Sequence, residues 1–173
     1  MHLGARIVTI VVAAVTTLAV IAPAAAVAAR PDEGADMQEL VDAYLRDKPG
    51  GVQIGPGRIS YENGAIVVTV ARSSLDVSGP NCPSGLFCIY DGTNFRYPRT
   101  ELSTCVWRDL YPYWNDVAGS VHYNKSAGAV TFINHGKTPH LGDTPLFAVG
   151  VSKRTISDLG DNADIADHVQ PYC

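Results

Sequence analysis

Four cysteines are the residues of this sequence whose chemistry is most readily assigned. They are Cys82, Cys88, Cys105 and Cys173. Their spacing lacks the paired C-x-x-C units of a structural zinc site, so disulfide bonds are the favoured chemistry in an exported chain. Four cysteines allow three pairings. We favour Cys82–Cys88 with Cys105–Cys173, because the Pro-Ser-Gly segment after Cys82 can turn the chain back on itself.

The histidines and the known catalytic motifs give no active site. His135 and His140 flank a Gly-Lys-Thr-Pro segment, which differs from the helical H-E-x-x-H spacing that places two imidazoles on one face. We therefore predict exposed loop histidines rather than a metal site. The chain also lacks a G-x-S-x-G nucleophile elbow and a glycine-rich phosphate loop. No carboxylate pair can be assigned from sequence, so the prediction is that the protein is not an enzyme.

The N-terminal segment is predicted to be an export signal. Arg6 supplies a positive charge ahead of an apolar run from residue 7 to residue 21. Ala26-Val27-Ala28 then fits the small-x-small rule for signal cleavage. The apolar run is shorter than the ~20 residues that a membrane-spanning helix needs. We therefore predict a cleaved signal peptide over residues 1–29 and a secreted, extracellular protein, rather than a retained anchor.

Charge limits the partners of the mature chain. The sequence has 13 basic and 17 acidic side chains, and losing Arg6 with the signal changes the net charge from −4 to −5. Binding to nucleic acid or to an anionic membrane requires clustered Lys and Arg, so we expect neither partner after signal removal. The remaining length, roughly 145 residues, suits one domain with a small accessory element. It does not define an oligomeric state.

The accessory element is predicted to be a helix plus a hairpin over residues 30–72. The apolar residues with helical spacing are Met37, Leu40, Val41, Tyr44 and Leu45. A Pro-Gly-Gly run that starts at Pro49 ends this helix. Two apolar runs on either side of Asn63-Gly64 then predict a β-hairpin. So small a unit should dock on the C-terminal part of the chain, or be a pro-segment that is removed after export.

The rest of the chain reads as a β domain over residues 82–173, behind a Ser-, Gly- and Pro-containing linker at 73–81. Short apolar runs at 87–90, 120–123, 130–133 and 146–149 alternate with turn residues, which predicts a mainly β sandwich or barrel. A weak internal repeat relates residues 89–91 to 132–134, and residues 107–116 to 156–162. Two such units packed face to face would bury their apolar faces jointly.

The segment from Cys82 to Val121 resembles one Greek-key motif of the βγ-crystallin family. The likeness is to the form found in secreted actinomycete metalloproteinase inhibitors (inhibitor family thirty-six). It rests on Tyr90 at a strand end, on the second aromatic Phe95, and on the Asn-Asp run that begins at Asn115. The family's glycine position two residues after the second aromatic carries Tyr97, and the second half of the chain matches less well. The resemblance implies a βγ-crystallin-like Greek-key sandwich of two motifs.

The same resemblance implies candidate calcium ligands. The family signature is two Asn or Asp residues, two variable positions, Ser or Thr, and then Ser. The run at 115–120 has Gly119 in place of the hydroxyl ligand, and the run at 161–166 keeps only the leading pair. The candidate ligands are Asn115, Asp116, Ser120, Asp161 and Asn162. Because calcium takes six to eight oxygens, we expect loops whose Asn and Asp side chains bond to the backbone, and no required cofactor.

An inhibitory loop is also implied. Family inhibitors resemble substrates held by a disulfide, and thermolysin-type peptidases prefer a bulky apolar residue just after the bond they cut. Cys105 and Val106 fit that description, and Trp107 follows them. We predict that Trp107 packs in the core, and we leave Val106 open between the core and the loop. The aromatic segment 111–114 is either a second contact patch or part of the inter-sheet core.

The leading hypothesis is therefore a secreted peptidase inhibitor that binds an extracellular peptidase, expected to be a metallopeptidase, through a substrate-like loop. The alternative is a non-inhibitory βγ-crystallin module that binds calcium or acts as a killer-toxin-like secreted effector. Both hypotheses rest on the resemblance, because a fold alone does not define a function.

Overall fold

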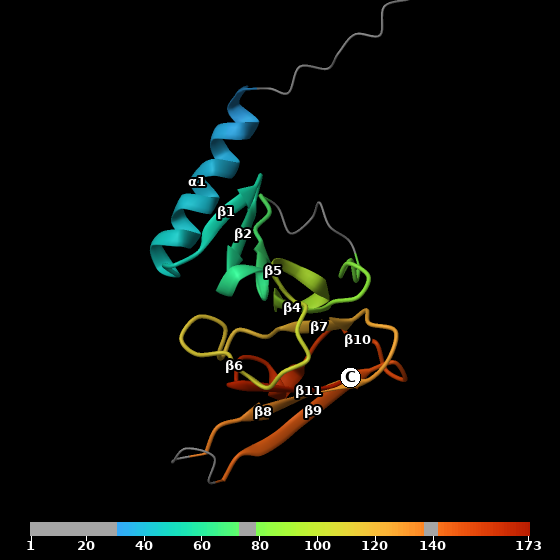
Figure 1. The fold of residues 1–173 in the computed structure, drawn as a ribbon. Helices are drawn as coiled ribbons and strands as arrows, with labels where there is room; N and C mark the ends of the chain where they lie inside the picture. Colours follow the sequence, from blue (N-terminus) through green and yellow to red (C-terminus); the bar gives the residue numbers. More distant parts are fainter. Residues whose placement is uncertain (1–30, 73–78, 137–141) are drawn as a thin grey trace, which may run out of the picture.

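The computed structural model describes residues 31–72, 79–136 and 142–173 as one α-helix and eleven strands in two antiparallel sheets (Figure 1). The predicted signal peptide, most of the predicted linker and His140 lie outside the described residues. Among the described helices, none is long and apolar enough to cross a membrane. The mainly β class predicted from the short apolar runs is confirmed.

The first sheet holds seven strands in the order β1-β2-β3-β5-β4-β7-β10. Its strands are β1 (Val52–Gly55), β2 (Arg58–Tyr61), β3 (Ile66–Thr69), β5 (Arg96–Leu102), β4 (Phe87–Gly92), β7 (Ser120–Tyr123) and β10 (Thr155–Ile156). The second sheet has the order β6-β11-β8-β9. Its strands are β6 (Arg108–Asp109), β11 (His168–Tyr172), β8 (Ala129–Asn134) and β9 (Thr144–Gly150). The four strand-like runs predicted from the sequence fall in β4, β7, β8 and β9.

Helix α1 (Pro31–Asp47) covers the predicted helical segment and lies beside β1 and β2 (Figure 1). Val41 is fully buried, and Met37, Tyr44 and Leu45 pack around the same core. Leu40 is 37% exposed, so the predicted apolar face is narrower than expected. Successive helical residues point about 100° apart, which places Leu40 on the flank of the face that Val41 centres.

The predicted hairpin is formed by β2 and β3, with Asn63 (φ 55°) and Gly64 (φ 91°) at its turn. Both residues tolerate the left-handed region, as the Asn-Gly signal requires. Strand β1, which pairs with β2 at the edge of the sheet, was not predicted from the sequence. Val52 and Ile54 of β1 are 66% and 54% exposed. The helix-plus-hairpin element thus contains a three-stranded sheet.

Strand β3 pairs with β5, so the N-terminal element extends the first sheet. A buried carboxylate strengthens this junction. Glu101 on β5 is 2% exposed at its side chain and contacts Arg99. It also accepts hydrogen bonds from Arg58 Nη2 (3.2 Å) and Thr69 Oγ1 (3.0 Å) of the hairpin. Because a buried charge is costly without partners, Arg58 and Thr69 bind the hairpin to β5 more firmly than the strand ladder alone.

Residues 87–172 form two four-stranded units, the first built from β4 to β7 and the second from β8 to β11. The strands of the two units pair in the same order. In the first unit β7 lies beside β4, which pairs with β5, and in the second β11 lies beside β8, which pairs with β9. A fourth strand beside the first is the Greek-key arrangement. The third strand of each unit joins the sheet of the other, since β6 pairs with β11 and β10 pairs with β7. This exchange joins the two units into one sandwich.

The core between the sheets is built from both units. Phe87 of β4 meets Phe132 of β8 edge-on at 6.4 Å between ring centroids, and Phe132 stacks on Phe147 of β9 at 4.5 Å. A second, smaller cluster contains Tyr90 and Phe95 with the Cys82–Cys88 disulfide. The other disulfide joins Cys105 to Cys173. The pairing favoured from the sequence is the one present in the structure.

Candidate functional site

The loop between β5 and β6, residues 103–107, is held from several directions. Cys105 is bonded to Cys173 at the end of β11. Lys125 Nζ donates a hydrogen bond to the Ser103 carbonyl (2.8 Å). Arg108, which follows the loop, donates to Thr104 Oγ1 (3.2 Å) and pairs with Glu62 at the β2–β3 turn. The loop is therefore braced at both ends while its middle faces solvent.

The middle of this loop carries two exposed apolar side chains. Val106 is 56% exposed and Trp107 is 41% exposed. The prediction that Trp107 packs in the core is wrong. Its ring lies over His168, with ring centroids 4.9 Å apart, at the surface of the second sheet. The core position beside it is filled by Leu110, which is fully buried.

The aromatic segment 111–114 divides between surface and core. Tyr111 is 72% exposed, whereas Trp114 is 3% exposed and meets Tyr61 edge-on at 5.1 Å. Trp114 Nε1 also donates to Tyr44 Oη of helix α1 (3.3 Å), and burial raises the pKa of Tyr44 well above its usual range. Trp114 thus belongs to the contact between the N-terminal element and the sandwich. Tyr111 borders an open groove of about 260 Å³ beside Pro49, Tyr61 and Glu62.

The hairpin of the first motif brings together Tyr90 and Phe95, the two aromatic residues on which the predicted resemblance rests. Tyr90 is fully buried and meets Phe95 edge-on at 5.4 Å. The left-handed residues are Asn94 (φ 54°) and Phe95 (φ 62°), not Tyr97. Ser120 holds this turn, since its hydroxyl accepts from the Phe95 N–H (2.9 Å) and donates to the Gly92 carbonyl (2.6 Å). The side chain of Ser120 is therefore used inside the fold.

The loops that carry the candidate calcium ligands face each other as a symmetric pair. The Asp116 N–H donates to the Ala166 carbonyl and the Asp164 N–H donates to the Ala118 carbonyl, both at 3.1 Å. Asp116 and Asp164 share a left-handed backbone, with φ of 54° and 55°. The structural equivalent of Asp116 is therefore Asp164, so the predicted equivalence of residues 115–116 with 161–162 is wrong.

The remaining candidate ligands make local contacts. Asn115 Nδ2 donates to Asp116 Oδ2 (3.0 Å), and Asp161 and Asn162 lie in the short turn η3 (Gly160–Asn162). A Cβ added to Gly119 would lie 2.5 Å from the Asp91 carbonyl oxygen. The backbone of β4 thus fills the place where the family signature has a hydroxyl. Asn115 and Asp116 thus contact each other through their side chains, while backbone hydrogen bonds to Leu110 and Ala166 fix the loop.

Asp91, beside this loop, has an unusual protonation equilibrium. Burial raises its pKa from 3.8 to about 6, with a further upward contribution from Asp164 and an opposing one from the Lys48 ammonium. Lys48 comes from the end of the N-terminal helix region and also donates to the Tyr113 carbonyl. A lysine therefore supplies the positive charge next to the two carboxylates.

The second motif brings together His135, which was predicted to be an exposed loop residue, and His168, which was not among the predicted site residues. His135 is exposed, as predicted, but its Nδ1 lies 2.6 Å from Nε2 of His168, which is 3% exposed. His135 Nδ1 is also 3.6 Å from Asp143 Oδ1. Among the His, Cys, Asp and Glu side chains of the described residues, one group of three lies close enough together to share a metal ion. It consists of His135, Asp143 and His168.

The internal repeat points to His168 once the two motifs are aligned by their equivalent backbone hydrogen bonds rather than by sequence similarity. The Gly119 N–H donates to the Tyr90 carbonyl (2.9 Å), and the Asp167 N–H donates to the Ile133 carbonyl (3.0 Å). Asp167 in the second motif is therefore equivalent to Gly119 in the first, and His168 is equivalent to Ser120. The predicted repeat of residues 89–91 with 132–134 is thus confirmed. The segment equivalent to the calcium signature of the first motif, however, begins after residue 161, where it was predicted to begin.

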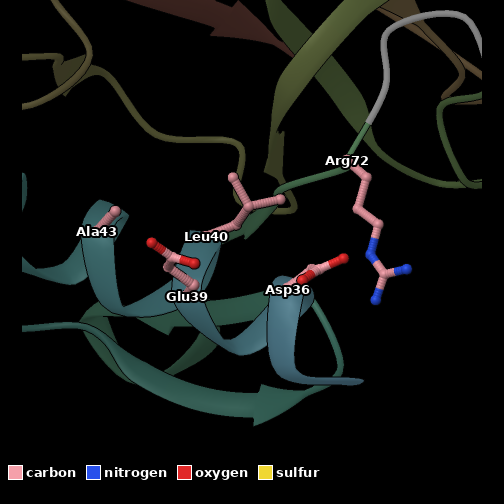
Figure 2. A pocket seen from close by; sticks show the side chains of 5 residues that line it. All are labelled: Asp36, Glu39, Leu40, Ala43 and Arg72. Atoms are coloured by element: carbon pink, nitrogen blue, oxygen red, sulfur yellow. The ribbon is translucent and has the colours of Figure 1, made fainter. Parts of the chain in front are cut away.

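An open cavity lies beside helix α1, away from the loops and histidines described above. Its volume is about 400 Å³, and it is lined by Asp36, Glu39, Leu40, Ala43 and Arg72 (Figure 2). Figure 2 shows two carboxylates projecting from the helix and Arg72 coming from the segment that follows β3. None of these residues belongs to a site predicted from the sequence.

Comparisons with known proteins bear on the fold alone. No family model matches the chain, and no curated protein matches it. A solved structure described as "Evolution of the eye lens beta-gamma-crystallin domain fold" matches 56% of this chain and 92% of its own, at 19% identity and a TM-score of 0.40. The strand order of the two sheets, rather than this distant likeness, defines the fold. The chain has the predicted βγ-crystallin-like sandwich of two Greek-key motifs.

Proposed function

We propose that this protein is a secreted inhibitor of an extracellular metallopeptidase and that residues 103–107 are its peptidase-binding loop. The observation that carries the proposal is the exposed side chain of Val106 directly after the disulfide-bonded Cys105. A bulky apolar residue just after the scissile bond is what a thermolysin-type peptidase selects. Two disulfides also suit a protein of an oxidising, extracellular compartment.

The bracing of the loop supports inhibition rather than ordinary cleavage. A segment already fixed by Cys105, by Lys125 and by Arg108 loses little conformational freedom on binding. The Cys105–Val106 peptide bond also lies inside the ring that the Cys105–Cys173 disulfide closes. A cut at this bond would leave both new ends tethered, so the product would stay in the peptidase cleft.

The exposed aromatics beside the loop enlarge the proposed contact. Trp107 and Tyr111 flank the short strand β6, and both side chains are exposed. Large, rigid aromatic side chains are common anchors of protein interfaces. Together with Val106 they form the proposed binding face of the inhibitor.

The test is a titration of thermolysin, subtilisin and trypsin with the oxidised protein. We expect stoichiometric loss of thermolysin activity alone, and Val106→Asp should weaken inhibition by about 100-fold, since it buries a charge in an apolar subsite. Val151→Asp is the matched control, because Val151 is another exposed valine, at 45% against 56% for Val106, in a turn of the second sheet. If all three peptidases stay active in excess protein, or if Val106→Asp inhibits as well as the parent, the proposal fails.

A further inference from the structure

We propose that His135, Asp143 and His168 bind one divalent transition-metal ion of the zinc class. Their candidate donor atoms all lie within 4.8 Å of one another. Two imidazole nitrogens and one carboxylate oxygen form a donor set that suits Zn²⁺, Cu²⁺ or Ni²⁺. Calcium and magnesium prefer oxygen ligands throughout. The donor set thus differs from the all-oxygen set of a calcium site, although His168 occupies the position equivalent to Ser120 of the calcium signature.

The three side chains come from three places that the fold holds at fixed spacing. His135 follows β8, Asp143 precedes β9, and His168 opens β11. Strand β11 is paired with β8 in the register His168↔Ile133. The Asp167 carboxylate accepts the His135 N–H (2.7 Å), which fixes the backbone of His135 beside β11.

The hydrogen bonding of the carboxylates also suits a metal site. Asp143 Oδ1 accepts the Gly136 N–H (3.1 Å), so the carboxylate is oriented toward the chain segment of His135. Asp109 Oδ1 lies 3.6 Å from Nδ1 of His168, the nitrogen that would not face the metal. Metal-bound histidines commonly direct their second ring nitrogen toward a carboxylate, which fixes the tautomer and the ring orientation.

A small movement of one ring would complete the site. His135 Nδ1 and His168 Nε2 are 2.6 Å apart, whereas two nitrogens bound to one tetrahedral zinc at 2.0–2.1 Å would be about 3.3 Å apart. His168 is held by burial, but His135 is exposed at the end of its strand. Binding of the ion would lengthen this nitrogen–nitrogen distance by less than ~1 Å. An open hollow of about 190 Å³, lined by both histidines with Asp109, Tyr111 and Asp167, gives the ion access.

The effect of the ion would be to join the β8–β9 hairpin to β11. These elements already meet through the ladder of β8 and β11, and a metal bond would add a link at the turn end of the hairpin, where His135 and Asp143 lie. A ligand that binds the folded state alone raises the unfolding temperature. The ion is thus expected to stabilise the second motif independently of peptidase binding.

The test is calorimetric titration of the chelator-treated, oxidised protein with Zn²⁺. We expect one ion per chain, an unfolding temperature several degrees higher with excess ion, and at least tenfold weaker binding for His135→Gln and for Asp143→Asn. Asp47→Asn is the matched control, an exposed carboxylate at the end of α1 that should not change binding. Absence of binding at millimolar Zn²⁺, or equal affinity in the parent and in both ligand variants, would overturn the site.

Trp107 provides a second readout that a nonspecific ion would not reproduce. Its ring lies over His168, and the chain has two tryptophans. Cu²⁺ should therefore quench part of the tryptophan fluorescence, and Trp107→Phe should abolish that part. Quenching of equal size in His135→Gln would contradict the assignment. His135→Gln should also inhibit thermolysin as the parent does, which separates loop binding from removal of the peptidase's zinc.

Discussion

The hairpin between β4 and β5 and the hairpin between β8 and β9 occupy equivalent places in the two motifs, yet different side chains hold them. In the first, the buried Tyr90 and the hydroxyl of Ser120 close the turn. In the second, the equivalent positions carry the half-buried Ile133 and His168, and the His168 ring meets that of His135. The backbone bonds at the two positions are nevertheless the same.

This difference separates what defines the fold from what defines its chemistry. The shared N–H to carbonyl bonds specify where each hairpin lies, whatever side chains it carries. The first hairpin uses apolar rings and a hydroxyl, which need no ligand and are satisfied inside the protein. The second uses imidazoles and carboxylates, which are also metal ligands. One motif is thus closed by packing, and the other is suited to closure by an ion.

The largest expected difference between the motifs follows from truncating Tyr90 and Ile133, which occupy equivalent positions near the end of the first strand of each. Tyr90→Ala should lower the free energy of unfolding by about 4 kcal/mol, because a fully buried ring leaves a cavity. Ile133→Ala should cost about 1.5 kcal/mol, because that side chain is half-buried. Urea unfolding of both variants measures the two values. Equal losses would show that the motifs depend alike on this position, and Tyr172→Ala at the exposed end of β11 is the control.

The two disulfides should differ in the same experiment. Chain entropy assigns about 4 kcal/mol to Cys105–Cys173, which closes a separation of 68 residues, and about 2 kcal/mol to Cys82–Cys88, which closes one of 6. Paired Cys→Ser variants measured by urea unfolding give the two losses. The first pair joins the two motifs, whereas the second lies in the hairpin cluster of the first motif. A larger loss for Cys82 and Cys88 would mean that local packing outweighs loop closure.

The features that could be predicted from the sequence are those fixed by neighbouring residues. Asn63-Gly64 specifies a turn through its own backbone preferences, and the run 120–123 has strand bounds that the structure reproduces. Cys82 and Cys88 are close enough in sequence for the intervening turn to favour their bond. The apolar face of α1 also followed from spacing, apart from Leu40 on its flank.

The features that could not be predicted depend on pairing between distant segments. Strand β1 was missed because its alternation of Val52 and Ile54 with polar residues spans four residues that lead into a Gly-Pro-Gly run, which is too short to identify a strand without its partner β2. Trp107 was misplaced because apolar character alone does not say which side of a sheet a loop residue takes. His135 and His168 lie 33 residues apart, and the register of β8 with β11 brings them together.

A smaller effect is expected from removing the hydroxyl that closes the first hairpin. Ser120→Ala leaves the Phe95 N–H without its acceptor in a buried turn, which should cost about 2 kcal/mol. Amide hydrogen exchange at Phe95 should rise together with the loss in unfolding free energy. Ser126→Ala, at an exposed serine, is the control. If Ser120→Ala unfolds like the parent, the ring contact of Tyr90 with Phe95 holds the hairpin without the hydroxyl.

The smallest expected effect concerns Asp91, whose equivalent in the second motif is the uncharged Asn134. The pKa of Asp91 rises from 3.8 to about 6 in the folded state, chiefly because of burial. The folded protein therefore binds the proton more tightly than the unfolded chain does. The parent should lose stability as the pH rises from about 4 through 6, and it should lose no more from this group above that range.

Asp91→Asn gives the first motif the residue that the second motif has at this position, Asn134. It should remove this dependence of stability on pH. At pH 7.5 the variant should be about 1 kcal/mol more stable than the parent, because the raised pKa already includes the attraction to Lys48 and solvent screens this partly exposed group. At pH 4 the two proteins should unfold alike. Urea unfolding from pH 4 to 8, with Asp161→Asn as the exposed control, measures the difference. A variant that is less stable at pH 7.5 would show that the Lys48 contact outweighs burial, so that the charge at this position helps to hold the N-terminal element on the first motif.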